Sequence, residues 1–126
     1  ITFEGPLFHR SLIEKIGLPQ KNFFIYGDDS EYFIRANKAG FKTYIVTDSK
    51  LIRQLPAPDL NKNFSWKNYY IVRNLIAIDK LHGSFPVRLL RKWFYLLLWY
   101  RRAKTRENKE MVIKAFKDGK DYESEN

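Results

Sequence analysis

An apolar, aromatic run that stops at a cluster of acids is the feature that most constrains this chain. Residues 23–26 read Phe-Phe-Ile-Tyr, Gly27 follows, and three carboxylates then occur within four positions, at Asp28, Asp29 and Glu31. Aromatic and β-branched residues in a short run favour a buried strand, and the amphipathic pattern that follows favours a helix. The pattern therefore predicts a strand that delivers acids to the first turn of a helix.

The acids have two interpretations, and the residue types alone leave both open. Asp28 and Glu31 have the spacing of a capping box, and Asp29 would lie in the first helical turn, where the helix dipole favours negative charge. In the second interpretation the crowding is functional, because neighbouring carboxylates repel and such repulsion is one way for a site to obtain a general base. Acids at the end of an apolar strand also mark the ligand-binding edge of open α/β sheets.

Helical periodicity dominates the rest of the chain. It predicts helices over residues 9–16, 28–39, 66–82, 86–104 and 107–117, the last of which would close at Gly119. Residues 41–46 are rich in β-branched and aromatic side chains and predict a second strand, residues 48–63 predict a long loop, and residues 120–126 predict a frayed tail. The expected fold class is α+β and mostly helical, with a few short strands.

Composition limits the kinds of site and partner. The chain has 126 residues, no cysteine and a net charge of +9, so thiolate metal sites are excluded and anionic partners such as phosphates, nucleic acid or an acidic membrane face are favoured. Residues 1–4 do not have the pattern of a signal peptide. The longest apolar run, residues 93–100, falls short of the roughly 20 residues that span a bilayer.

Basic residues bracket that apolar run on both sides. They are Arg88, Arg91, Lys92, Arg101, Arg102, Lys104 and Arg106. A helix that is apolar nearly all round must bury more than one side. Three fates remain open, in decreasing order of preference: packing in the core or against another subunit, lying in a membrane interface, and contacting nucleic acid.

Five short motifs occur in an order that resembles a known family. They are Phe3-x-Gly5; Arg10-x-x-Ile13-x-x-Ile16-Gly17-Leu18-Pro19; Phe24-Ile25-Tyr26-Gly27-Asp28-Asp29-x-Glu31-Tyr32-x-x-Arg35; Gly40-Phe41; and Trp66-Lys67-x-Tyr69-Tyr70-x-Val72-Arg73-Asn74. Together they resemble the acceptor-side half of family 2 glycosyltransferases, in particular the rhamnosyl- and galactofuranosyl-transferase branch. The resemblance covers residues 3–74, with a weaker echo at residues 115–119.

The resemblance implies a C-terminal portion of a GT-A glycosyltransferase domain. Residues 1–82 would form the acceptor-side half of that domain and residues 83–126 a C-terminal helical extension. The enzyme would invert the anomeric centre while moving a sugar from a nucleotide-diphosphate sugar to a glycan or lipid-linked acceptor in cell-envelope polysaccharide synthesis. It would be cytoplasmic and peripheral at the inner face of the cell membrane.

The resemblance also assigns roles to residues. Asp28 resembles the family's catalytic base, which takes the proton from the acceptor hydroxyl, and Asp29 is the alternative base. The residues expected to bind acceptor or substrate are Glu31, Arg53, Trp66, Tyr69, Tyr70, Arg73 and Asn74. For the aromatic residues, core packing at helical spacing competes with stacking on an acceptor sugar. Arg73 would meet a phosphate, and Arg35 would pair with Glu31 one turn away.

Two departures from the family pattern limit what this chain would do by itself. No Asp-x-Asp metal motif and no nucleotide-binding βαβ unit precede Phe3, so the chain alone would be an inactive fragment. Arg53 or Gln54 lies where the family commonly has a metal-binding His. Either the metal is held without this ligand, or the enzyme is metal-independent or degenerate. The resemblance implies a divalent metal (Mg²⁺ or Mn²⁺) in the full-length enzyme and none in this fragment. Exposed apolar surface would favour a homodimer. The alternative function is a basic module that binds a membrane surface or nucleic acid without catalysis.

Overall fold

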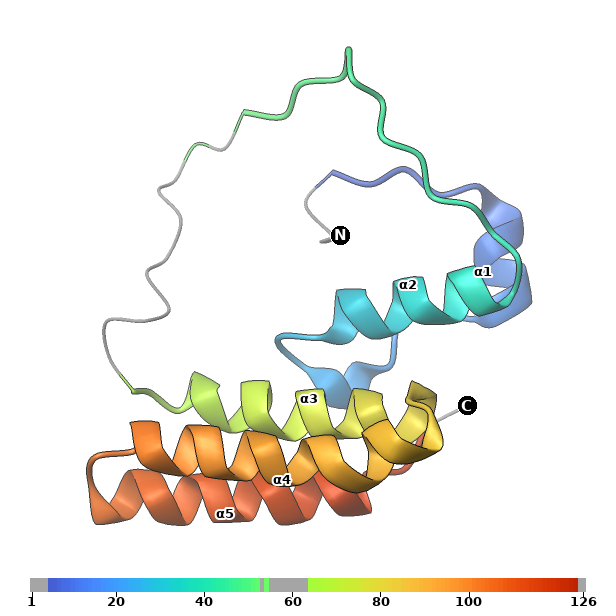
Figure 1. The fold of residues 1–126 in the computed structure, drawn as a ribbon. Helices are drawn as coiled ribbons and strands as arrows, with labels where there is room; N and C mark the ends of the chain where they lie inside the picture. Colours follow the sequence, from blue (N-terminus) through green and yellow to red (C-terminus); the bar gives the residue numbers. More distant parts are fainter. Residues whose placement is uncertain (1–4, 53, 55–63, 125–126) are drawn as a thin grey trace. The chain divides into compact units, whose positions relative to one another are not determined.

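The computed structural model describes residues 5–52, 54 and 64–124, and the regular structure in these residues is helical (Figure 1). Five α-helices are present in this part of the chain, together with one short 3₁₀-helix, η1 (Lys21–Phe23). The helices are α1 (Arg10–Ile16), α2 (Asp28–Lys38), α3 (Lys67–His82), α4 (Phe85–Arg102) and α5 (Arg106–Asp121). The helices predicted from periodicity are therefore confirmed.

The prediction of an α+β fold with short GT-A strands is wrong, because the described residues contain no strand. Residues 23–26 follow η1 into a tight loop, in which Phe24 and Tyr26 have positive φ angles. Residues 41–46 have no regular structure, and Tyr44, Ile45 and Val46 are exposed. A strand needs a hydrogen-bonded neighbour, and neither run has one among the described residues.

The chain divides into two compact units. The first unit consists of Ile1–Pro19 and Asp29–Asn63, and the second of Gln20–Asp28 and Phe64–Asn126. The division between residues 82 and 83 that the family resemblance implies stays a prediction.

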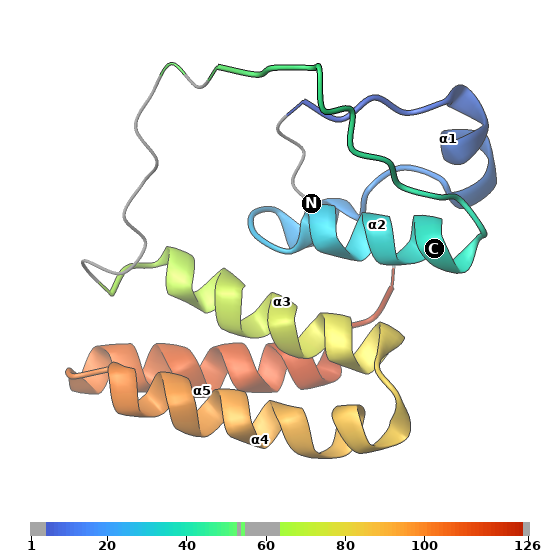
Figure 2. The same cartoon turned by 45° about the horizontal axis from the view of Figure 1, so that its top comes forward.

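Three antiparallel helices form the body of the second unit. Figures 1 and 2 show α3, α4 and α5 side by side, with α4 running opposite to its two neighbours. Their core contains Val72 and Ile76 of α3 and Ala115 and Phe116 of α5, with partly buried aromatic residues of α3 and α4 packed around them. The i, i+4 spacing of Val72 and Ile76 places both on one face of α3, which explains why periodicity predicted these helices correctly.

Gly119 lies inside α5, and its predicted role as a helix end is wrong. A Cβ atom at this position would lie 2.6 Å from the Arg73 carbonyl oxygen and 3.0 Å from Ile76 Cβ. The glycine therefore allows the backbones of α3 and α5 to approach closely. Lys120 and Asp121 continue the helix, and Tyr122 is buried, so the prediction of a frayed tail fails at least as far as residue 122.

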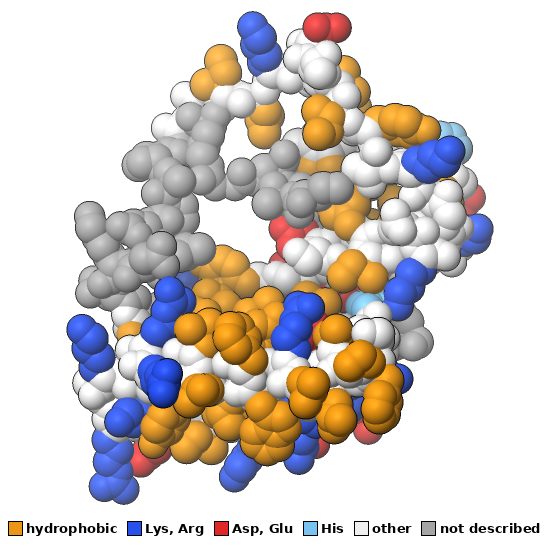
Figure 3. All heavy atoms as spheres, in the orientation of Figure 1, with side chains coloured by type: hydrophobic (Ala, Val, Ile, Leu, Met, Phe, Trp, Pro, Cys, Tyr) orange, Lys and Arg blue, Asp and Glu red, His pale blue; other side chains and the backbone are white. Residues whose placement is uncertain are grey.

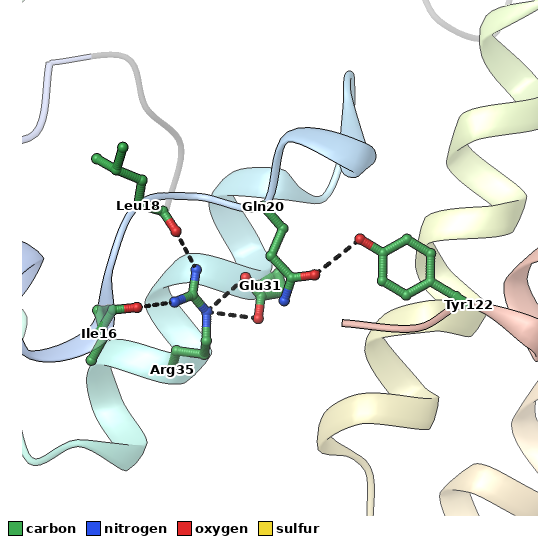
Figure 4. A network of polar contacts seen from close by, with 6 residues as sticks. All are labelled: Ile16, Leu18, Gln20, Glu31, Arg35 and Tyr122. Carbon is green, nitrogen blue, oxygen red and sulfur yellow. Dashed lines mark hydrogen bonds and ion pairs between the residues drawn. The ribbon is translucent and has the colours of Figure 1, made fainter. Parts of the chain in front are cut away.

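Tyr122 anchors the segment of residues 20–28 in the second unit. Its ring lies 5.1 Å from that of Phe23, and its hydroxyl donates a buried hydrogen bond of 3.0 Å to Gln20 Oε1 (Figure 4). Phe23, Ala77 and Tyr122 together form a small cluster of buried residues, with Ile78 and Leu81 against it. The 3₁₀-helix is thus held by side chains from α3 and from the end of α5.

Arg35 ties the first unit together. Its Nε donates to both carboxylate oxygens of Glu31, at 2.9 and 3.0 Å, which confirms the predicted i, i+4 pair. Its terminal nitrogens donate to the carbonyls of Ile16 and, at 2.9 Å, Leu18, so the same guanidinium also binds the chain beyond α1 (Figure 4). A small cluster of Leu12, Tyr32 and Ala36 completes the packing of α1 against α2.

We expect Gly119→Ala to lower the free energy of unfolding by about 1–2 kcal/mol. The added methyl would overpack the α3–α5 contact at a cost of about 1–3 kcal/mol, which exceeds the gain of up to about 1 kcal/mol from the better helix propensity of Ala. Urea denaturation of the chain measures the change. Lys117→Ala, at an exposed position of the same helix, is the control and should change stability by less than about 0.5 kcal/mol. A Gly119→Ala chain as stable as wild type would contradict close helix approach.

We expect Arg35→Met to destabilise the first unit by about 3–5 kcal/mol, because it removes the guanidinium that pairs with the fully buried Glu31 carboxylate. Hydrogen exchange of the α2 amides reports this loss. The double variant Glu31→Gln/Arg35→Met should regain much of it, because the buried charge is then gone. Arg10→Met breaks an exposed i, i+4 ion pair with Glu14 and is the control, with an expected cost below about 1 kcal/mol. Equal losses for Arg35→Met and Arg10→Met would argue against the buried pair.

Candidate functional site

A tight loop in the second unit leads to the first of the acids, Asp28. The backbone N–H of Ile25 donates to the Phe23 carbonyl at 2.7 Å, and Phe24 between them has φ 60° and ψ −59°. These values define a γ-turn of the rare, strained form. Tyr26 also has a positive φ of 62°, which is uncommon for a bulky residue. Such backbone strain persists only where surrounding contacts over-determine the conformation.

Two neighbouring residues of α3 supply those contacts. The buried Asn74 amide nitrogen, Nδ2, lies within hydrogen-bond distance of the carbonyls of Phe23 (3.0 Å), Ile25 (3.0 Å) and Tyr26 (2.5 Å). Arg73 Nε donates to Asn74 Oδ1 at 2.8 Å, so the orientation of the amide is set by its neighbour. We call Arg73 and Asn74, with the carbonyls that they bind, the loop clamp.

Arg73 extends the clamp toward η1. A terminal nitrogen of its guanidinium donates to the Asn22 carbonyl and, at 3.2 Å, to that of Phe23. Backbone carbonyls that lack helix or sheet partners must find donors elsewhere, and here α3 side chains provide them. The loop is therefore bound to α3 through its main-chain carbonyls as well as through side-chain packing.

Gly27 closes the loop. Its φ is +83°, and a Cβ atom there would lie 3.2 Å from Ile78 Cδ1 and 3.4 Å from Asn74 Cβ. Both the backbone conformation and the close approach to α3 therefore favour glycine. The next residue, Asp28, begins α2.

Asp28 and Asp29 are both half-buried in the first turn of α2. Asp29 Oδ1 accepts a hydrogen bond of 2.7 Å from the backbone N–H of Ser30, which is a local helix-start contact. The first-turn position predicted for Asp29 is thus confirmed. In residues 5–52, 54 and 64–124, no three His, Cys, Asp or Glu side chains are grouped so that they could hold a metal ion.

Exposed aromatic side chains adjoin the loop clamp. Phe24 is 67% exposed and Trp66 is 54% exposed, and the ring of Tyr70 lies 5.1 Å from Phe24 and 5.9 Å from Trp66. The Arg73 guanidinium carbon lies 4.9 Å from the Tyr70 ring centroid. We call Phe24, Trp66 and Tyr70 the aromatic platform. It combines accessible ring faces with a cation, an arrangement suited to a ligand with both apolar and anionic parts.

Three further residues were predicted to bind acceptor, and one of them, Tyr69, has its ring 5.0 Å from that of Tyr70. Tyr69 donates from its hydroxyl to Asp118 at 2.5 Å, and burial together with this hydrogen bond raises the pKa of Tyr69. Glu31 is buried in its pair with Arg35 in the first unit. Arg53 lies outside the described residues. Direct contact with a substrate stays a prediction for these three residues, and the geometry of Tyr69 and Glu31 favours structural roles.

The structure adds one residue to the candidate site and changes the role of another. Phe24 was expected to be buried in a strand, yet its exposed ring belongs to the aromatic platform. Asn74 was expected to contact a substrate, which stays a prediction; its buried amide nitrogen lies within hydrogen-bond distance of three backbone carbonyls of the loop, which favours a structural role. The nearby Asn22 and Gly27 are turn-favouring residues and were the sequence signal for a loop.

Comparison with known proteins gives one partial relationship. No family model matches the chain, and no solved structure matches it. The chain is 31% identical over 78 residues to galactofuranosyltransferase GlfT2 of Mycolicibacterium smegmatis. The match includes 62% of this chain and 12% of that protein's length. The chain is therefore similar to a short part of a much longer glycosyltransferase, in agreement with the class of enzyme that the five motifs resemble.

Proposed function

We propose that this chain is the acceptor-side and catalytic-base portion of an inverting family 2 glycosyltransferase. The enzyme moves a sugar from a nucleotide-diphosphate sugar to a glycan or lipid-linked acceptor in cell-envelope polysaccharide synthesis. The partial similarity to a galactofuranosyltransferase supports the class of reaction. The observation that carries the proposal is the loop clamp, because the strained loop that it holds bears both an exposed aromatic residue, Phe24, and the acid Asp28.

The proposed chemistry assigns one step to each part of the site. An acceptor sugar packs its apolar C–H face on the aromatic platform, and Arg73 balances negative charge nearby. Asp28 accepts the proton of the acceptor hydroxyl as that oxygen bonds to C1 of the donor sugar and the nucleoside diphosphate departs with the electrons of the broken bond. Asp29 is the alternative base. A rigid loop contributes by orientation, which removes part of the entropic barrier to reaction.

We assign no residue of this chain to the binding of the nucleotide-sugar donor. We propose that another part of the same enzyme binds the nucleotide-sugar, so that the 126-residue chain alone does not transfer sugar. A divalent metal, Mg²⁺ or Mn²⁺, belongs to that complete enzyme. The described residues offer no three-ligand group for it, and no step assigned here passes through a metal.

The helical unit also supports a location. No helix in the described residues is long and apolar enough to cross a bilayer. We propose that the enzyme is peripheral at the inner face of the cell membrane, because α4 exposes apolar and basic side chains together. The same surface supports the second candidate function, a membrane-binding module without catalysis. A homodimer and nucleic-acid binding stay predictions from the sequence.

Substitution of the proposed base tests the catalytic assignment. In the complete enzyme we expect Asp28→Asn to lower kcat by about 100- to 10,000-fold, with the KM for nucleotide-sugar nearly unchanged, because the lost group acts in the transition state. Transfer of radiolabelled sugar from a panel of nucleotide-sugars to a lipid-linked acceptor measures both constants.

Two further carboxamide variants complete that experiment. Asp121→Asn, at an exposed position in α5, is the matched control and should leave kcat unchanged. A large loss for Asp29→Asn with little loss for Asp28→Asn would move the base to Asp29. Wild-type rates for both variants would overturn the catalytic assignment and favour the binding module.

The aromatic platform predicts an effect on acceptor affinity. We expect Trp66→Ala to weaken acceptor-glycan binding by roughly tenfold and Trp66→Phe by less, since a ring face is worth about 0.5–1.5 kcal/mol beyond its area. NMR titration of the chain with acceptor oligosaccharides reports the affinity without any need for catalysis. Tyr44→Ala removes an exposed aromatic residue of the first unit and is the control. Unchanged affinity for Trp66→Ala would exclude stacking on this platform.

A further inference from the structure

A cavity of about 390 Å³ opens in the second unit, where the end of α3 meets the beginning of α4. Phe85 and Leu89 form its apolar side. Its basic side chains come from all three long helices, namely Lys80, Arg88, Lys92 and Lys120. Lys80 Nζ also donates to the Tyr122 carbonyl at 2.7 Å. The cavity presents four cations against one carboxylate, that of Asp79, so it favours an anionic group such as a phosphate.

The carboxylate of Asp79, which lines the cavity, has one oxygen without a hydrogen-bond donor in the described part of the chain. The residue is only 5% exposed, and its Oδ2 lies 3.0 Å from Arg91 Nε. The single hydrogen on that Nε is donated to the Tyr95 hydroxyl at 2.9 Å, so Arg91 supplies Asp79 with charge but with no hydrogen bond. Among the described residues, Oδ2 has no hydrogen-bond donor.

A buried oxygen without a donor costs free energy, and a hydroxyl that a ligand brings to the Asp79 carboxylate at the cavity wall would lower this cost. Burial raises the pKa of Asp79, while the positive charge of Arg91 acts in the opposite direction. The cavity thus favours a ligand that carries a phosphate and a hydroxyl together.

The outer face of α4 is apolar and adjoins the cavity. Trp93 is 55% exposed and Phe94 is 59% exposed, and Leu90 and Leu97 are exposed on the same face. We call these four residues the apolar stripe. Figure 3 shows hydrophobic side chains gathered over α4, with Lys and Arg side chains around them. The exposed Phe85 and Leu89 line the cavity and lie on the adjoining face of α4.

The positive charge of α4 indicates which partner could cover this face: a second copy of the chain, a nucleic acid or a membrane. The helix contains five basic residues and no acidic residue. A second copy would bring two such sets of cations together, and a nucleic acid would leave the apolar stripe facing phosphates. An anionic membrane surface satisfies both features, since it offers apolar depth beneath a negative headgroup layer.

We propose that α4 lies in an anionic membrane surface and that the cavity at its first turns binds the phosphoglycerol headgroup of a phospholipid. Arg88, Lys92 and Lys120 hold the phosphate, a glycerol hydroxyl donates to the Asp79 carboxylate at the cavity wall, and the acyl chains pass over Phe85 and Leu89 onto the apolar stripe. The inference rests on the peripheral membrane location under Proposed function, and it does not depend on the sugar-transfer step.

Vesicle flotation of the 126-residue chain tests the site in the wild-type protein. Phosphatidylmethanol has the same charge as phosphatidylglycerol but lacks the headgroup hydroxyls, so vesicles with equal fractions of either lipid in phosphatidylcholine differ only in the group that Asp79 would bind. We expect roughly tenfold tighter binding to phosphatidylglycerol. Equal binding to both lipids overturns the headgroup site and leaves the membrane surface standing. No binding to any vesicle overturns both the site and the proposed location.

Variants then assign the contacts. Asp79→Asn should remove the preference between the two lipids, whereas Lys92→Gln should weaken binding to both by a similar factor of about five, as expected near an anionic surface. Lys117→Gln, on exposed α5 surface, is the charge control. Phe94→Ser should reduce binding to every vesicle, and Ile113→Ser on α5 is its control. A lipid preference that survives Asp79→Asn in a chain with wild-type circular dichroism overturns the assigned contact.

Discussion

The hydrogen bonds from Arg73 and Asn74 to the carbonyls of residues 22–26 are the interaction on which the candidate site depends. Beyond Phe23 the loop belongs to no helix or sheet, so its backbone groups lack the regular hydrogen-bond partners that these structures supply. Two of its non-glycine residues have positive φ angles. Side chains from a packed helix replace the missing backbone partners. The position of Asp28, which directly follows this loop, is therefore set by helix α3 and not by a sheet edge.

Different faces of helix α3 contact the core, the loop and the cavity. Val72 and Ile76 face the core, Arg73 and Asn74 bind the loop, and Asp79 lines the cavity beside α4. Close packing with α5 fixes this helix, and Gly119 makes that closeness sterically possible. Because interiors are tightly packed and transmit strain, a change at the α3–α5 contact would reach the loop as well.

Strand prediction failed at residues 23–26 and 41–46 for a definable reason. Aromatic and β-branched residues report a preference for a half-buried, pleated surface, and strand formation also requires a partner that no local pattern specifies. Phe23 illustrates this difference. It is buried as its apolar character indicated, but it is buried against Ala77 and Tyr122 at the end of a 3₁₀-helix.

The sequence by itself determined the helices, the Glu31–Arg35 pair and the resemblance to a glycosyltransferase, because these depend on spacing within a few residues or on local motifs. Tertiary structure alone decided the loop clamp, the platform formed by Phe24 with Trp66 and Tyr70, and the orphaned oxygen of Asp79. The loop clamp and the platform join residues up to about fifty positions apart. Among the residues that the structure describes, the oxygen of Asp79 lacks a donor because the Nε hydrogen of Arg91 is already donated to the Tyr95 hydroxyl. Such relations exist only once the helices are packed.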